Sequence, residues 1–176
     1  MLVIAFNGSP RKEGNTHHLL QQVFAPLREA GVTCEEIQIG GTLLAGCKAC
    51  GACAKKPGQC AQANDPINSW IARARQADGI ILASPTYFAN VSAEMKAFID
   101  RVGMVCLCDG RCLRRKVGAP VIAVRRGGAV QAYNTLMSFF GINSMVVPMS
   151  SYWNFGFGLN PGEVENDAEG VQTMRA

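Results

Sequence analysis

The sequence has no long hydrophobic run: its apolar stretches, such as residues 1–6 and 79–83, are far shorter than the roughly 20 residues that cross a bilayer. A membrane helix is therefore not expected. No basic segment precedes the first apolar run, so the pattern of a secretory signal is absent and a cytoplasmic location is expected. The net charge is only +4 and the basic residues are scattered, which argues against nucleic-acid binding. Charged residues make up 17% of the chain and hydrophobic residues 48%, which excludes a disordered chain.

The 176 residues are expected to form a single domain, residues 1–176. Short apolar runs that end in polar turns alternate with segments of helical periodicity. This alternation predicts an α/β fold in which a parallel sheet is covered by helices on both faces. The predicted strands are 2–6, 33–39, 79–83, 120–125 and 144–147, and the predicted helices start near residues 15, 65, 92 and 129.

Two helix ends carry specific predictions. Asn15 and Thr16 are expected to cap the first helix. A closing helix is expected to start near Asp167, but the chain leaves it only about three turns, which are too few to cover a sheet face. We therefore expect this helix to be incomplete and the natural protein to continue beyond Ala176.

The loop after the first predicted strand, residues 8–16, has the composition of a phosphate site. It combines glycines, hydroxyl side chains, Asn15 and Arg11 at the start of a helix. Free backbone N–H groups and the positive helix end favour an anion there, and arginine can contact it with two donors. The loop matches neither the G-x-G-x-x-G dinucleotide fingerprint nor the P-loop motif, so neither of those sites is expected. An ordinary strand-to-helix turn is the alternative.

The loop after the third predicted strand, residues 84–92, contributes the aromatic residues Tyr87 and Phe88. The carboxyl ends of parallel strands meet at one edge of a sheet, so this loop is expected beside the first one. A flat heteroaromatic ring needs an aromatic surface to stack on and N–H donors directed at its edge. Loop aromatics often pack on the core, but together with the phosphate loop they predict a site for a flat ring next to a phosphate.

These two loops and residues 96–101 resemble the NADPH-dependent FMN reductase branch of the flavodoxin-like superfamily, and the resemblance extends from the first strand to Gly170. It implies a three-layer α/β sandwich with a five-stranded parallel sheet in the order 2-1-3-4-5, and FMN at the point where the order reverses. Arg125 and Arg126 replace the small residues of many relatives, and either a cofactor contact or a solvated pair is open for them. The resemblance implies a phosphate site at Ser9, Arg11, Asn15 and Thr16, isoalloxazine contacts from Pro85, Thr86, Tyr87, Phe88 and Asn90, and a third flavin loop at Gly127 and Gly128.

Four of the eight cysteines, Cys47, Cys50, Cys53 and Cys60, lie in the long loop after the second predicted strand. The three-residue spacing is typical of compact iron–sulfur loops, whereas structural zinc sites usually present two separated pairs. Residues 47–53 resemble the cluster loop of the iron-sulfur flavoproteins, which implies a [4Fe-4S] cluster on these four ligands. A zinc site and a loop of free or partly oxidised thiols stay open as alternatives. The resemblance implies no role for a second group, Cys106, Cys108 and Cys112, and these are expected to be incidental thiols.

The resemblance implies an FMN-dependent oxidoreductase that passes electrons from NAD(P)H to a flavin, quinone or similar acceptor. The alternative is an iron-sulfur flavoprotein in which FMN and a [4Fe-4S] cluster on residues 47–60 exchange electrons with a ferredoxin-like protein. A non-enzymatic protein that uses the cysteine loop for metal or redox sensing is a third possibility. The flavin N5 is the reacting group, so no catalytic side chain is assigned. A homodimer or homotetramer is expected, as in relatives, with neither a membrane nor a nucleic acid as a partner.

Overall fold

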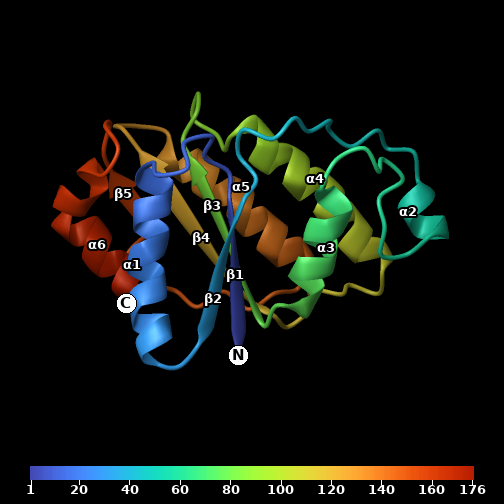
Figure 1. Ribbon diagram of the computed structural model, residues 1–176, viewed down its shortest axis with the longest axis horizontal. Helices are drawn as coiled ribbons and strands as arrows, with labels where there is room; N and C mark the ends of the chain where they lie inside the picture. Colours follow the sequence, from blue (N-terminus) through green and yellow to red (C-terminus); the bar gives the residue numbers. More distant parts are fainter.

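The computed structural model describes residues 1–176 as a central sheet between two layers of helices (Figure 1). The strands are β1 (Leu2–Asn7), β2 (Thr33–Gln38), β3 (Gly79–Pro85), β4 (Val117–Val124) and β5 (Phe155–Phe157). The helices are α1 (Asn15–Glu29), α2 (Ala52–Lys55), α3 (Ile67–Gln76), α4 (Ala93–Cys108), α5 (Ala129–Ile142), the 3₁₀ turn η1 (Glu163–Asn166) and α6 (Ala168–Arg175).

The sheet has the order β2-β1-β3-β4-β5, and all neighbouring strands are parallel. This confirms the predicted flavodoxin-like order. The chain leaves β1 toward β2 on one side and returns to β3 on the other. The loops after β1 and β3 therefore separate at the carboxyl edge, where open α/β sheets bind their ligands.

Each face of the sheet has its own core. Ile4 and Phe6 of β1 pack in the core shared with α3, α4 and α5, whereas Val3 and Ala5 pack in the core shared with α1 and α6. This alternation follows from the two-residue period of a strand. All four side chains are buried. A strand that is buried on both faces is apolar at every position, and this continuous apolar run is the feature from which the strand was predicted.

The fifth strand was predicted at residues 144–147, and this was wrong. That segment contributes only an isolated bridge between Val146 and Val117. Pro148 follows it and has no N–H group with which to extend a ladder. The strand that pairs with β4 is β5, in which a Cβ on Gly156 would lie 2.4 Å from Cδ2 of Leu19 in α1. Any larger residue there would force the buried Leu19 side chain to shift.

The short closing helix α6 contributes to the cover over one face of the sheet. Asp167 caps it, because its carboxylate accepts a 3.0 Å hydrogen bond from the N–H group of Gly170. Met174 is buried in the core that α6 shares with α1. The helix has eight residues, and η1 adds the buried Val164 to the same core.

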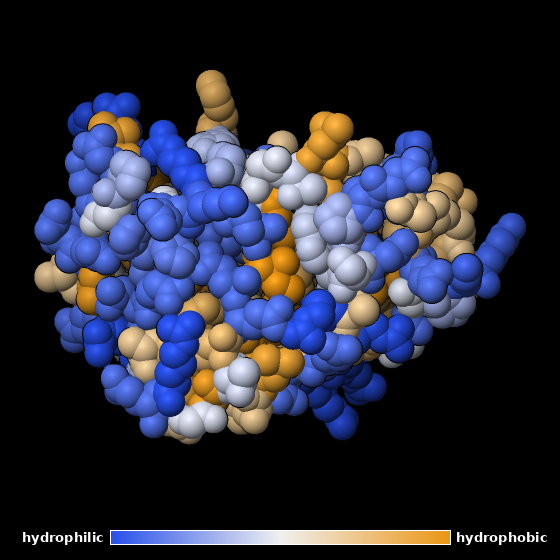
Figure 2. Space-filling model, viewed as in Figure 1, coloured by the Kyte–Doolittle hydropathy of each residue, from blue (hydrophilic) through white to orange (hydrophobic).

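No helix of this fold combines the length and the apolar character that a membrane span requires. Figure 2 shows a mostly hydrophilic surface over α1 and β2, with apolar side chains in smaller patches between polar ones.

Candidate functional site

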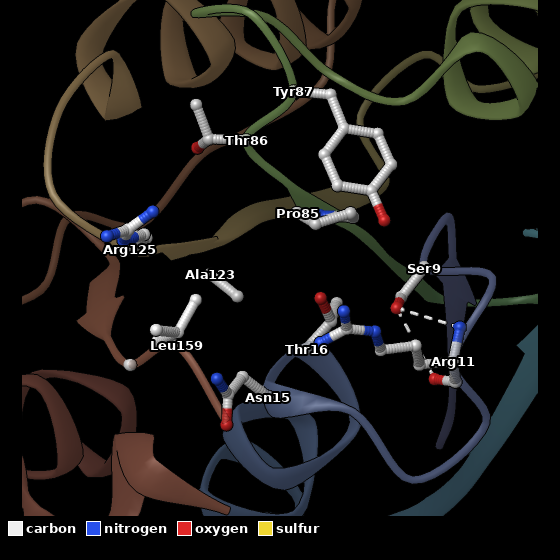
Figure 3. A pocket seen from close by; sticks show the side chains of 11 residues that line it. Ser9, Arg11, Asn15, Thr16, Pro85, Thr86, Tyr87, Ala123, Arg125 and Leu159 are labelled. Atoms are coloured by element: carbon white, nitrogen blue, oxygen red, sulfur yellow. Dashed lines mark hydrogen bonds between the residues drawn. The ribbon is translucent and has the colours of Figure 1, made fainter. Parts of the chain in front are cut away.

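A pocket of about 150 Å³ lies at the carboxyl edge of the sheet, between the loops that follow β1 and β3 (Figure 3). Seven of the residues predicted to bind a flavin line it together: Ser9, Arg11, Asn15, Thr16, Pro85, Thr86 and Tyr87. Figure 3 shows the Tyr87 ring extending from its loop toward the side of the pocket that holds Ser9. The fold therefore brings the phosphate loop and the aromatic loop to one site. Their contacts with a cofactor stay a prediction.

The start of α1 faces this pocket with free donors. The predicted capping role of Asn15 and Thr16 was wrong: Gly14 is the N-cap, and no side chain accepts a hydrogen bond there. The N–H groups of the first helical residues have no partner within the helix. The preceding loop is held by Ser9, whose Oγ accepts a 3.2 Å hydrogen bond from the N–H group of Arg11. The loop is thus ordered while the helix terminus is left available to an anion.

Three buried polar atoms in the pocket have no hydrogen-bond partner in the chain: Asn15 Oδ1, Thr16 Oγ1 and Thr86 Oγ1. An unpaired buried polar group costs about 1–3 kcal/mol, so such atoms mark a place where a ligand completes the bonding. A threonine hydroxyl can donate to a phosphate oxygen, and Figure 3 shows the Arg11 side chain next to Thr16, whereas Thr86 lies across the pocket, near Arg125. Thr16 and Arg11 therefore fit the phosphate end of FMN.

Two predicted flavin residues, Phe88 and Asn90, lie outside the pocket lining. Tyr87 and Asn90 exchange backbone hydrogen bonds of 2.8 and 3.0 Å, which closes a tight hairpin between them. Phe88 and Ala89 occupy its corner with positive φ angles of 45° and 59°, and the Phe88 side chain is fully exposed. Asn90 Oδ1 accepts a 3.0 Å hydrogen bond from Thr135 Oγ1 on α5. Asn90 therefore positions the hairpin that carries Tyr87.

Gly127 and Gly128 also lie outside the pocket lining. Gly128 is the N-cap of α5 with φ of 88°. A Cβ on it would lie 2.7 Å from Cα of Ala89, whereas a Cβ on Gly127 would meet open space. The predicted third flavin loop thus acts on the pocket by letting α5 approach the hairpin closely.

Four further residues line the pocket: Ala123, Arg125, Gly158 and Leu159. For Arg125 the sequence had left two roles open, a cofactor contact and a solvated pair. Gly158 and Leu159 directly follow β5, and they were missed because the fifth strand had been placed some ten residues too early. Glu163 orders this loop, since its Oε2 accepts hydrogen bonds of 2.7 and 2.9 Å from the N–H groups of Leu159 and Asn160. These bonds to the Asn160 and Leu159 segment lower the pKa of Glu163.

The four cysteines of the long loop line a second pocket of about 200 Å³, which borders α4 and shares no residue with the first. Cys47 and Cys50 are exposed, and Cys53 and Cys60 are half-buried. No group of three histidine, cysteine or acidic side chains is arranged so that it could hold a metal ion. The structure does bring the four predicted ligands to one cavity. Their role as ligands stays a prediction.

Arg101 of α4 forms several hydrogen bonds with this cysteine loop. Its side chain donates hydrogen bonds to the carbonyl oxygens of Ala45 (3.2 Å) and Gln62 (2.8 Å), and to Sγ of Cys60 (3.4 Å). It also pairs with Asp65. Burial acts to lower the pKa of Arg101, but the hydrogen bonds to Asp65 and Cys60 outweigh it and raise that pKa. A buried positive charge thus lies against the sulfur of one of the four predicted ligands.

Comparisons with known proteins identify the family to which the sequence is similar. The sequence profile of the family described as NADPH-dependent FMN reductase matches residues 1–160. An iron-sulfur flavoprotein of Methanocaldococcus jannaschii is 37% identical over 99% of this chain and 92% of its own length. An iron-sulfur flavoprotein of Methanosarcina thermophila is 31% identical over 99% of this chain and 90% of its own.

Solved structures show the same fold. The Trp repressor binding protein of Bacillus subtilis superposes with a TM-score of 0.72 at 20% identity, covering 98% of this chain and 96% of that one. The NAD(P)H:quinone oxidoreductase of Methanothermobacter marburgensis superposes with a TM-score of 0.69 at 14% identity, covering 99% of this chain and 94% of that one. At these identities the structures support the fold alone.

Proposed function

The chain belongs to the NADPH-dependent FMN reductase family. We propose that it is an electron-transfer flavoprotein with two redox centres, FMN and a [4Fe-4S] cluster. It is an FMN-dependent oxidoreductase, as the family resemblance implied. The main observation in support of the [4Fe-4S] cluster is that four cysteines line one pocket next to the buried Arg101: Cys47, Cys50, Cys53 and Cys60. The iron-sulfur flavoproteins among the relatives support it.

The residues of the first pocket act by binding and orienting. Arg11, the hydroxyl of Thr16 and the start of α1 would hold the phosphate of FMN, while Pro85, Thr86 and Tyr87 offer a surface to its ring. In the second pocket the four thiolates would hold the cluster, and Arg101 would balance part of their charge. Bound FMN supplies one- and two-electron chemistry, and a bound [4Fe-4S] cluster supplies one-electron transfer.

Anaerobic purification of the wild type and of Cys50→Ser tests this proposal. We expect the wild type to contain iron, acid-labile sulfide and FMN, and Cys50→Ser to lose most of the iron while it keeps FMN, because the flavin pocket shares no residue with the cysteine pocket. Cys34→Ser, on β2, is the matched control and should keep both. Wild type that holds no iron after anaerobic reconstitution contradicts the second centre. Recovery of FAD in place of FMN by mass spectrometry contradicts the flavin assignment.

A second candidate is direct reduction by NAD(P)H, with a flavin, quinone or similar molecule as the acceptor. The position of Arg125 in the lining of the flavin pocket favours it, because an exposed cation at the mouth suits an anionic nucleotide. Anaerobic addition of NADPH or NADH should bleach the flavin absorbance within a turnover time if this candidate is correct. A flavin that is reduced only by a reduced ferredoxin would exclude it.

The remaining expectations extend this proposal. We expect a ferredoxin-like protein or a small molecule as the redox partner, and a homodimer or homotetramer as the working assembly. A cytoplasmic location suits eight free cysteines, because reducing compartments keep thiols reduced. Light scattering of the purified protein and pull-down with ferredoxin test the assembly and the partner.

A further inference from the structure

Cys108, which belongs to the second cysteine group, lies in contact with a predicted cluster ligand. Its Sγ is 3.8 Å from Sγ of Cys53, although 55 positions separate the two residues in the sequence. Cys108 is the last residue of α4, and Cys53 lies in α2. Both side chains are half-buried. A fifth thiol, outside the lining of the cysteine pocket, therefore lies beside one of the four predicted ligands.

The two sides of this contact differ in how firmly they are held. α4 is anchored by buried side chains along its length, including Phe98, Val102 and Val105. α2 has only four residues and none of them is buried. An S–S bond is about 2.05 Å long, so the two sulfurs must approach by somewhat less than 2 Å. α2 can make that shift at the cost of few packing contacts.

We propose that Cys53 and Cys108 form a reversible disulfide when the cysteine pocket holds no cluster, and that this bond withdraws Cys53 from ligation. The second part rests on the proposed function, and the disulfide itself does not. The chemistry is exchange with a small-molecule disulfide: one thiolate attacks it and expels a thiol, and the other thiolate then displaces the second thiol. Two protein thiols are oxidised to one disulfide, and the small disulfide is reduced to two thiols.

The other cysteines of these two segments serve as controls. Trypsin cuts after Lys48 and Lys55 and so releases Cys53 in peptide 49–55. It also cuts after Arg101 and Arg111 and so releases Cys108 in peptide 102–111. The same peptides contain Cys50, which is exposed, and Cys106, which is fully buried. A cross-link between the two peptides can thus be assigned to its sulfurs by four single serine variants.

The experiment treats the full-length protein, stripped of iron by a chelator and still loaded with FMN, with oxidised glutathione and digests it without reductant. We expect the 49–55 to 102–111 cross-link in the wild type, in Cys50→Ser and in Cys106→Ser, and its loss in Cys53→Ser and Cys108→Ser. FMN absorbance reports that each variant is folded. Absence of the link in folded wild type, or its persistence in Cys108→Ser, overturns the proposal.

Iron uptake tests the consequence for the cluster. After oxidation, the wild type should take up iron and sulfide only once a reductant has opened the disulfide, whereas Cys108→Ser should take them up without that step. Oxidised wild type that reloads as fast as the reduced protein despite the cross-link refutes the withdrawal of Cys53. If fully reduced wild type takes up no iron at all, the proposed second redox centre fails, and the cross-link result still decides whether the disulfide exists.

Discussion

Arg101 donates hydrogen bonds from both of its terminal nitrogens to the carboxylate of Asp65, and its side chain is completely buried. The pair joins the middle of α4 to the end of the cysteine loop, just before α3 begins. The same two nitrogens also donate to the loop carbonyls of Ala45 and Gln62, whereas Nε has no partner in the chain. A single buried cation therefore orders a loop that has almost no apolar core of its own.

Replacing Arg101 by methionine should lower the free energy of unfolding by about 3–5 kcal/mol, because it leaves the Asp65 charge without its partner. Urea denaturation measures this. Lys96→Met is the matched control on the same helix, since Lys96 and Asp100 form an exposed pair and should contribute only about 0.3–0.5 kcal/mol. Equal losses in the two variants would show that the Arg101 pair is no more than a surface contact.

Replacing Gly128 by alanine should both destabilise the protein and weaken FMN binding. The added Cβ meets Cα of Ala89 at 2.7 Å, and the φ of 88° is strained for any L side chain, for which we expect about 1–3 kcal/mol. The hairpin that carries Tyr87 must then move away from the pocket. Gly127→Ala is the control, because its Cβ meets open space. Thermal unfolding and FMN titration of both variants measure the difference, and indistinguishable variants would contradict this account of the third loop.

The sequence predicted a parallel sheet because short apolar runs that stop at polar turns alternate with helical segments, whereas the strand order was implied by the family resemblance. Strand β1 and the loop after it show this most clearly, and the flavin pocket could be predicted from that loop and the one after β3. β5 could not, because it has three residues and a glycine at its centre. Its position depends on Gly156 fitting against Leu19, a contact between segments far apart in the sequence.

The same reason limited the prediction of the sites. Leu159 lines the flavin pocket only because it follows the true β5. Arg101 and Cys108 take their roles from the way α4 packs beneath the cysteine loop, and no local pattern near either residue indicates that loop. Spacing along the chain identified the four loop cysteines, but a fifth thiol from another element could be found only in three dimensions.

Replacing Thr16 by valine should weaken FMN binding by about 1.5–3 kcal/mol, the range for a hydrogen bond to a charged group. It should leave the stability of the FMN-free protein unchanged or slightly higher, because the buried hydroxyl has no partner within the chain. Fluorescence titration with FMN and urea denaturation separate the two effects. Ser138→Ala, on the exposed side of α5, is the control and should alter neither. A loss of stability without FMN, at unchanged affinity, would mean that Thr16 serves the core alone.

Arg125 and Arg126 are adjacent, exposed and equally charged, but only Arg125 lines the flavin pocket. Arg125→Ala should therefore weaken FMN binding by about 0.5–1.5 kcal/mol, and Arg126→Ala should leave the affinity unchanged, although both variants lose the same charge. The contribution is electrostatic and exposed to solvent, so it should shrink as the ionic strength rises. Titrations with FMN at low and high salt measure both effects. Equal affinities for the two variants would indicate a solvated pair. A higher KM for NADPH in Arg125→Ala, at unchanged FMN affinity, would instead assign this arginine to the nicotinamide nucleotide.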